Sequence, residues 1–312
     1  MHDRCCTQER QGLSAGSLHA QLRPMSKHID SLWDGITSVE FSMERELSLT
    51  LEPFFDTVKK CHDCGAEVCT LKGNRKRTND LRVSALFLKR SLNDLRGVWK
   101  LLLLGYTSQA GSVAAAAFEN ATLAACTAGD IKMANKLLDS KTGDIPWTVL
   151  DLCKIDARQG EEDEARRLGR KFSNRNYEVA WRAYYGEYMW FCKLKHPNMT
   201  AALHDAFSTP MSKSEFVVTA FPDARDENLT VKCTILCCTA ERVHNAADRY
   251  SRSMELDGQD ARVVSWLERM DLIMPALFEA HDRLAKHPLP FSTNNSRIAD
   301  EWREFRRMPE DS

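Results

Sequence analysis

The stretch from Leu101 to Ala128 reads LLLLGYTSQAGSVAAAAFENATLAACTA and carries one formal charge, on Glu119. Because charged residues make up 28% of the whole chain, a run this long with one charge is not expected on an open surface. A carboxylate inside a helical core must find a cation or hydrogen-bond donors, or stay protonated. The pattern therefore predicts a buried polar centre at Glu119 and its neighbour Asn120.

The same stretch is long enough to cross a membrane, but its polar side chains and the Glu119-Asn120 pair make insertion costly. We therefore expect it to be buried in protein, with no membrane partner. The N-terminal sequence MHDRCCTQERQGLSAG lacks the apolar segment of a signal peptide. Eleven cysteines, an odd number found mostly in apolar helical segments, indicate reduced thiols and a cytoplasmic location.

Charge and composition narrow the range of partners and folds. Lys and Arg total 43 against 44 Asp and Glu, so no global field favours nucleic acid, and any such binding must be local. Only 14 glycines and 10 prolines occur in 312 residues, which favours long helices over many short strands.

Helical patterning begins near Ser38 and continues towards Lys72, with Pro53 marking a break or the first turn of a new helix. Apolar residues recur at spacings of four and three from Leu81, which predicts a long helix. We expect this helix to end at Gly105. The next helix is rich in Ala, Gly and Ser, which allows neighbouring backbones to approach closely.

Further helices are expected over about 130–140, from Pro146 to Gln159-Gly160, from about 161 to Leu194, and over about 225–256 and 260–286. The sum is an all-α, multi-helix, mostly antiparallel bundle with at most one short strand near 215–220. We divide the chain into an N-terminal arm (1–30), a helical bundle (38–200), a connection (201–228), a C-terminal helical pair packed on the bundle (229–290) and a tail (291–312).

The helix expected from about residue 161 to Leu194 carries two parallel strips of side chains. We interpret the first as an aromatic core stripe, since apolar residues at this period are ordinary. It comprises Tyr177, Trp181, Tyr184, Tyr188 and Phe191. In the second strip, Tyr185 and His196 lie eleven residues apart, which is three helical turns, so they face the same way. If this helix packs on the small-residue helix, His196 or Arg182 could approach Glu119.

The long helix, the small-residue helix with one glutamate, and the tyrosine-rich helix ending in Cys-Lys-Leu-Lys-His-Pro resemble a group of uncharacterised bacterial all-helical proteins. These are related to the HEPN (higher eukaryotes and prokaryotes nucleotide-binding) superfamily, and the resemblance covers about residues 80–200. It implies a metal-independent ribonuclease, in which four to six residues separate an Arg from a following His on one helix. Here His196 is the candidate, with Lys193 or Lys195, or with Arg182 supplied across a dimer. Residues 189–191 are not cationic, which departs from that pattern.

The spacing Cys61-His-Asp-Cys64, with Cys69 five residues on, is compatible with a zinc site. A strong zinc signal would be two Cys-x-x-Cys pairs at a suitable separation. Ordinary helix cysteines are the alternative, and we predict no metal and no cofactor. A basic loop, Lys72-Gly-Asn-Arg-Lys-Arg77, could contact phosphates or be simply solvated.

These features leave three functions open. The first is a binding or regulatory module, whose partner is a protein or a nucleic acid and which could form a homodimer. The second is the HEPN-like ribonuclease or nucleotide-modifying protein, with His196, Arg182 and Lys195 as catalytic candidates. The third is a small-ligand-binding bundle, with Glu119, Asn120 and Tyr185 lining an internal pocket.

Overall fold

The computed structural model describes residues 31–196, 222–223, 225 and 228–289. The expected arm (1–30), the possible strand near 215–220, most of the 201–228 connection and the tail (291–312) lie outside the described residues. The regular secondary structure of the described part is helical, and its β pairing there is a single isolated bridge between Gly73 and Leu256. The all-α expectation is confirmed.

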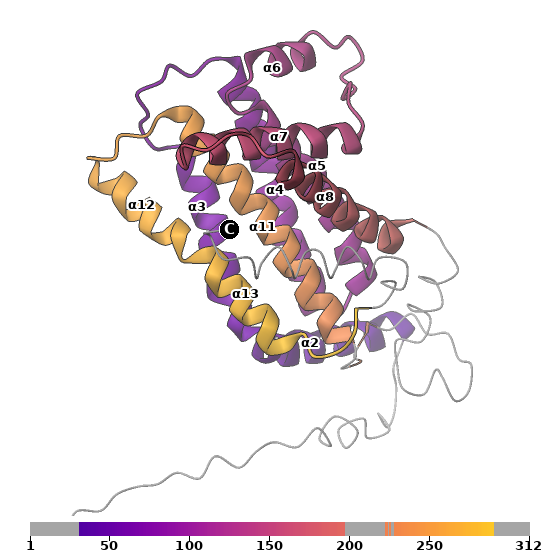
Figure 1. Ribbon diagram of the computed structural model, residues 1–312. Helices are drawn as coiled ribbons and strands as arrows, with labels where there is room; N and C mark the ends of the chain where they lie inside the picture. Colours follow the sequence, from indigo (N-terminus) through magenta and orange to yellow (C-terminus); the bar gives the residue numbers. More distant parts are fainter. Residues whose placement is uncertain (1–30, 197–221, 224, 226–227, 290–312) are drawn as a thin grey trace, which may run out of the picture.

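The centre of the bundle is α5 (Thr107–Thr127), which packs against α4 (Asn79–Leu103) and α11 (Leu229–Met254) (Figure 1). Its alanines are buried on almost every side, because small side chains let several helices approach one axis. On Gly111 an added Cβ would lie 2.9 Å from the Cβ of Leu194, closer than two carbons can pack. The expected close approach therefore exists, between α5 and the end of α8 (Asn174–Lys195).

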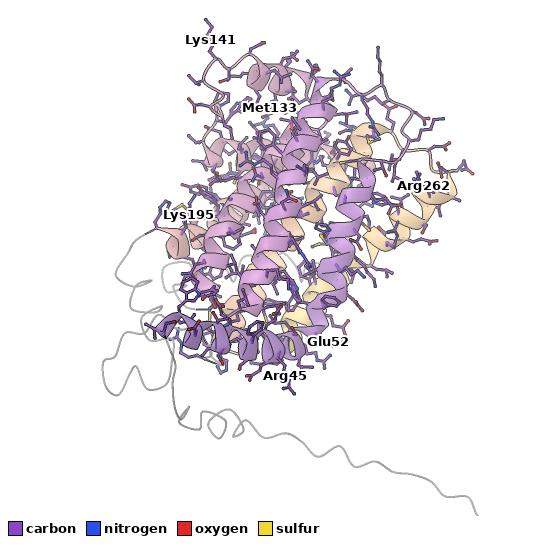
Figure 2. The ribbon with its side chains drawn as sticks, turned by 180° about the vertical axis from the view of Figure 1, so that it is seen from behind. Arg45, Glu52, Met133, Lys141, Lys195 and Arg262 are labelled. Atoms are coloured by element: carbon purple, nitrogen blue, oxygen red, sulfur yellow. The ribbon has the colours of Figure 1, made fainter. Side chains whose placement is uncertain are left out.

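The first two helices are α2 (Leu32–Thr50) and α3 (Glu52–Val68). α2 starts earlier than the expected Ser38, because Ser31 caps it by accepting a hydrogen bond from the Asp34 N–H at 3.2 Å. Pro53 lies in the first turn of α3, where its missing N–H costs nothing. α2 lies across one end of the bundle, with Arg45 on its outer side (Figures 1 and 2).

Three helices follow α5, namely α6 (Ile131–Leu138), α7 (Val149–Arg167) and α8. The expected start at Pro146 is wrong, because Thr148 caps α7 in a reciprocal capping box with Asp151. The expected stop at Gln159-Gly160 is also wrong. A glycine inside a helix costs about 1 kcal/mol relative to alanine, and burial of the residues around Gly160 on α7 offsets this cost. The helix ends before Gly169, whose φ of +63° favours glycine.

The expected C-terminal pair is three helices, since the segment after α11 divides into α12 (Ala261–Asp271) and α13 (Ile273–Leu284). Pro275 explains the division. A proline within a helix lacks an N–H donor, and its ring meets the carbonyl four residues before it, here that of Asp271. The chain bends at Leu272, and Pro275 then fits the first turn of α13.

The basic loop after α3 is tied to the far end of α11. The Asn74 N–H donates to the Glu255 carbonyl at 2.9 Å, and the Arg75 guanidinium donates to the Ser253 carbonyl at 3.1 Å. Arg75 also pairs with the buried carboxylate of Asp80 at 2.7 Å. Arg77 donates to the Cys69 carbonyl at 2.9 Å. Two of the cations in this loop therefore hold the fold and are not presented to phosphates.

Candidate functional site

Glu119 is not the buried centre that the sequence predicts. Its side chain is 35% exposed at the edge between α5 and α8. The Tyr188 hydroxyl donates to its Oε1 at 2.9 Å, and the Nζ of Lys195 lies 3.8 Å from the same oxygen. The next residue, Asn120, points about 100° away from Glu119 around the helix axis and faces α4. There its Nδ2 donates to Asp94 at 2.8 Å, so the two neighbours do not form one centre.

The other predicted residues are spread along α8. Arg182 pairs with Glu178 at 2.9 Å, on the surface and away from Glu119. His196 caps the carboxyl end of α8 and is exposed. Arg182 and His196 are fourteen positions apart, which corresponds to about 21 Å along a helix. Tyr185 is partly buried beside Tyr188, with ring centroids 6.4 Å apart. Of the predicted set, the structure brings together Glu119 and Lys195.

The buried charged centre of the bundle lies at Arg242 on α11, whose side chain is 2% exposed. Its Nε and Nη2 donate to Glu187 Oε2 at 3.1 and 2.8 Å, and its Nη1 lies 3.8 Å from Asp156. The guanidinium stacks 3.8 Å from the ring centroid of Tyr184 and 5.1 Å from that of Phe118. Burial opposes the charge on Arg242, but Glu187 outweighs it, and the arginine pKa is raised further above its ordinary value.

A second arginine extends this centre towards the surface. Arg249 lies 3.4 Å from Asp156 and 3.3 Å from Asp163, which links α11 to α7. Burial raises the pKa of Tyr184 to about 12, so this phenol is neutral throughout the physiological range. A set of paired charges, in which three acids (Glu187, Asp156 and Asp163) face two arginines, holds α7, α8 and α11 together.

The sequence contains a signal for this centre that its analysis missed. Arg242 and Arg249 are seven residues apart, and Arg242 stands three after Thr239 and four before Ala246, both of which are buried. Cations at the positions of a core stripe indicate buried charge, just as the single acid in an apolar run does. At Arg242 the indication is correct, and at Glu119 it is not.

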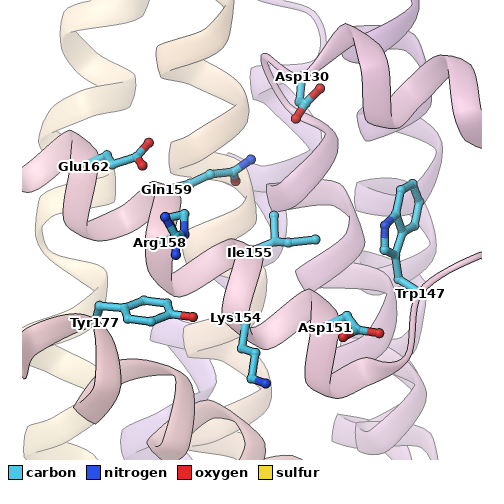
Figure 3. Close-up of a pocket in the computed structure, with 9 residues that line it drawn as sticks. All are labelled: Asp130, Trp147, Asp151, Lys154, Ile155, Arg158, Gln159, Glu162 and Tyr177. Atoms are coloured by element: carbon cyan, nitrogen blue, oxygen red, sulfur yellow. The ribbon is translucent and has the colours of Figure 1, made fainter. Parts of the chain in front are cut away.

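A groove of about 630 Å³ runs along the outer face of α7 (Figure 3). Its floor comes from residues spaced three and four apart on this helix, with Ile155 near the middle. Trp147 closes one end and Tyr177, from α8, the other (Figure 3). The lining residues are Asp130, Trp147, Asp151, Lys154, Ile155, Arg158, Gln159, Glu162 and Tyr177.

Local structure fixes both ends of the groove. Asp130 accepts hydrogen bonds from the first N–H groups of α6, and the capping box at Thr148 sets how the chain enters α7 beside Trp147. At the other end, the Glu161 carboxylate binds the Arg170 guanidinium and accepts the Ser173 N–H at 2.7 Å. These bonds fix the turn between α7 and α8, which places Tyr177.

Cations of the groove lie over aromatic rings. The Lys154 ammonium is 5.2 Å from the ring centroid of Trp181, and the Arg158 guanidinium is 5.2 Å from that of Tyr177. At the Trp147 end, Lys136 of α6, which is outside the groove lining, is 4.8 Å from the ring centroid of Trp147. Such contacts hold long side chains in place while leaving their charge accessible. The sequence pattern did not reveal this site, because the helix expected from Pro146 stops at Gln159-Gly160, before the end of the groove floor at Glu162.

Cys61, Cys64 and Cys69 form no metal centre within the described residues, where no group of His, Cys, Asp and Glu could hold a metal ion. The Cys61 thiol donates to the Ala240 carbonyl at 3.4 Å, and burial raises the pKa of all three thiols. They pack as neutral side chains. Among the helices that the structure describes, none has the length and apolar character needed to span a membrane.

Comparisons with known proteins were made in three ways, against models of protein families, curated proteins and solved structures, and none of the three gave a match.

Proposed function

We propose that this chain is a binding module and that the groove along α7 holds a segment of a partner protein. The observation that carries the proposal is the groove's set of side chains. Trp147, Arg158 and Tyr177 surround Ile155 there, and Trp, Tyr and Arg are the residues that dominate the binding energy of protein interfaces. From Asp151 to Glu162 the floor extends about 16 Å, the length of a short helical or extended segment.

The charge of the groove supports a protein partner over a nucleic acid. Asp130, Asp151 and Glu162 oppose Lys154 and Arg158, so three negative and two positive charges leave a net charge of −1 on the lining. A nucleic-acid surface needs several cations that neutralise phosphates. Within the described residues, Lys154 and Arg158 contact aromatic rings and form no salt bridge, so both can turn to acidic groups of a partner.

The geometry gives less support to the ribonuclease that the HEPN resemblance implies. Its cation would have to share a phosphate with His196, but within one molecule Arg182 lies about 21 Å from His196 along the helix. Lys195 lies 3.8 Å from the Glu119 carboxylate, which competes with a phosphate. The small-ligand alternative needs an enclosed pocket at Glu119, Asn120 and Tyr185. Glu119 and Asn120 instead have separate partners on α8 and α4.

The test is selection from a displayed library of random peptides, followed by titration of enriched peptides against variants. We expect Trp147→Ala and Arg158→Ala each to weaken binding about tenfold or more. Arg262→Ala, an exposed change on α12, is the matched control and should leave binding unchanged. Peptides that bind all variants equally would overturn the proposal.

The same variants, together with His196→Ala, distinguish the peptide-binding proposal from nucleic-acid binding and from a ribonuclease. A pool of single-stranded RNA that binds the chain and is released by Trp147→Ala and Arg158→Ala would assign the groove to nucleic acid. RNA cleavage that His196→Ala abolishes would replace the binding proposal with the ribonuclease.

A further inference from the structure

α2 exposes large apolar side chains on the side that faces away from the bundle. Trp33 is 77% exposed, Phe41 70% and Leu49 75%, and they follow one another at intervals of eight residues, about 12 Å along the helix. The opposite side of α2 is buried through Met43 and Leu47. Single exposed apolar residues are ordinary, but three of this size on one short helix indicate a surface that is covered by something.

The charges of α2 restrict what can cover it. Within α2, Asp34, Glu40, Glu44 and Glu46 stand against Arg45. Lys100 of α4 also pairs with Glu44 at 2.9 Å, so the helix and its bound lysine carry a net charge of −2. An anionic membrane surface or an acidic partner is repelled by such a helix. An apolar segment rich in arginine is attracted to it.

The chain itself contains such a segment beyond the described residues. Residues 297–308 read RIADEWREFRRM, in which Ile298, Trp302 and Phe305 recur at spacings of four and three. This spacing predicts an amphipathic segment that carries its apolar residues on one side. The segment has four arginines against three acids, a net charge of +1, and three of the arginines stand in its second half, from Trp302 to Met308.

The described chain ends at the same end of the bundle that α2 crosses (Figure 1). The His287 N–H donates to Thr230 Oγ1 at 2.9 Å, at the start of α11. Beside that start, the Asp223 N–H donates to the Gly105 carbonyl at 2.9 Å. Tyr106, which follows Gly105, donates its hydroxyl to Glu40 of α2 at 2.5 Å.

The intervening chain has a reach comparable to the length of α2. Eight residues separate Leu289 from Ile298, and eight extended residues reach about 26 Å. α2 itself, with 19 residues, is about 28 Å long. We infer that residues 297–308 dock on α2 of the same molecule and cover Trp33, Phe41 and Leu49.

Hydrogen exchange of the full-length chain, followed by mass spectrometry, tests this inference. The double variant Trp302→Ala/Phe305→Ala should speed exchange of the α2 amides about fivefold or more, whereas Asn294→Ala/Asn295→Ala should not. Reciprocally, Trp33→Ala/Phe41→Ala should speed exchange within 297–308. Unchanged exchange of α4 amides shows in each case that the bundle has remained folded.

Equal α2 exchange in the wild-type chain and the Trp302→Ala/Phe305→Ala variant would overturn the inference. So would α2 protection that rises with protein concentration together with a dimer mass by light scattering, because the covering surface would then be a second copy. Neither readout depends on the α7 groove, so this inference and the proposed function can fail independently.

Discussion

Arg242 and Glu187 are joined by two hydrogen bonds, of 3.1 and 2.8 Å, in a place where neither side chain is more than a tenth exposed. The pair connects α11 to α8. Asp156 adds α7 to the same centre, so a single guanidinium sets the relative positions of the helices that form the groove. Stability of the bundle and geometry of the groove are therefore linked through one residue.

Replacing Arg242 with alanine should destabilise the protein by about 3–5 kcal/mol, because Glu187 would keep its charge without a partner in the interior. Chemical denaturation measures this loss. Arg252→Ala is the control, since Arg252 is half exposed and pairs with Asp248 four residues before it. That change should cost less than about 1 kcal/mol, and equal losses in the two variants would contradict the buried centre.

Glu119→Ala should cost about 1 kcal/mol or less, because its carboxylate is at the surface and its distance from Lys195 is 3.8 Å. The comparison is with Glu187→Ala, which leaves Arg242 without its closest carboxylate and should cost several times more. Both losses come from the same denaturation experiment. If Glu119→Ala proved the more damaging change, the polar centre would be at Glu119 after all.

Two glycines at helical positions should respond oppositely to alanine. A Cβ on Gly111 would lie 2.6 Å from Leu194 Cδ1, so Gly111→Ala must separate α5 from α8 and should lose about 1–3 kcal/mol. A Cβ on Gly97 in α4 would meet Val113 at an ordinary 3.7 Å. Gly97→Ala should gain about 0.5–1 kcal/mol from its better helix propensity. Thermal unfolding of both variants checks the two signs.

The turn between α7 and α8 should weaken in acid. A hydrogen bond from Arg170 is the main reason that the Glu161 pKa is lowered, with burial opposing it and the Ser173 N–H assisting. A lowered carboxyl pKa contributes stability above the unfolded value, near pH 4.5, and loses it as pH falls through the folded value. The Tm advantage of the wild type over Glu161→Gln should therefore shrink from about pH 6 to pH 3. A constant difference across that range would contradict this assignment.

Regular features of the chain could be predicted from local sequence. The four-three spacing from Leu81 predicts α4, and Pro53 correctly opens α3 because its position suits a first helical turn. Gly160 suggests a helix end that does not exist, whereas Pro275 marks a real break within the single helix expected over 260–286. A glycine weakens a helix by an amount that packing can offset, whereas a proline inside a helix removes a donor and collides with the preceding turn.

The site was harder to predict, since it depends on how helices are rotated about their axes. One residue turns a side chain by about 100°, which is enough to send Asn120 to α4 and Glu119 to the surface. The groove also joins α7 with residues from the preceding loop and from α8. No single periodic pattern in the sequence contains all of them.

The pairing of Gly73 with Leu256 has a consequence for the order in which this protein can form as it is synthesised. Chains emerge from the ribosome from the N-terminus, and early segments fold before later ones exist. The connection between α3 and α4 finds its hydrogen-bond partners in Met254 and Glu255, so it stays open until nearly all of α11 has been made. Completion of α11 also supplies the Ser253 carbonyl that accepts from the Arg75 guanidinium, so this arginine reaches its final place only when α11 has formed.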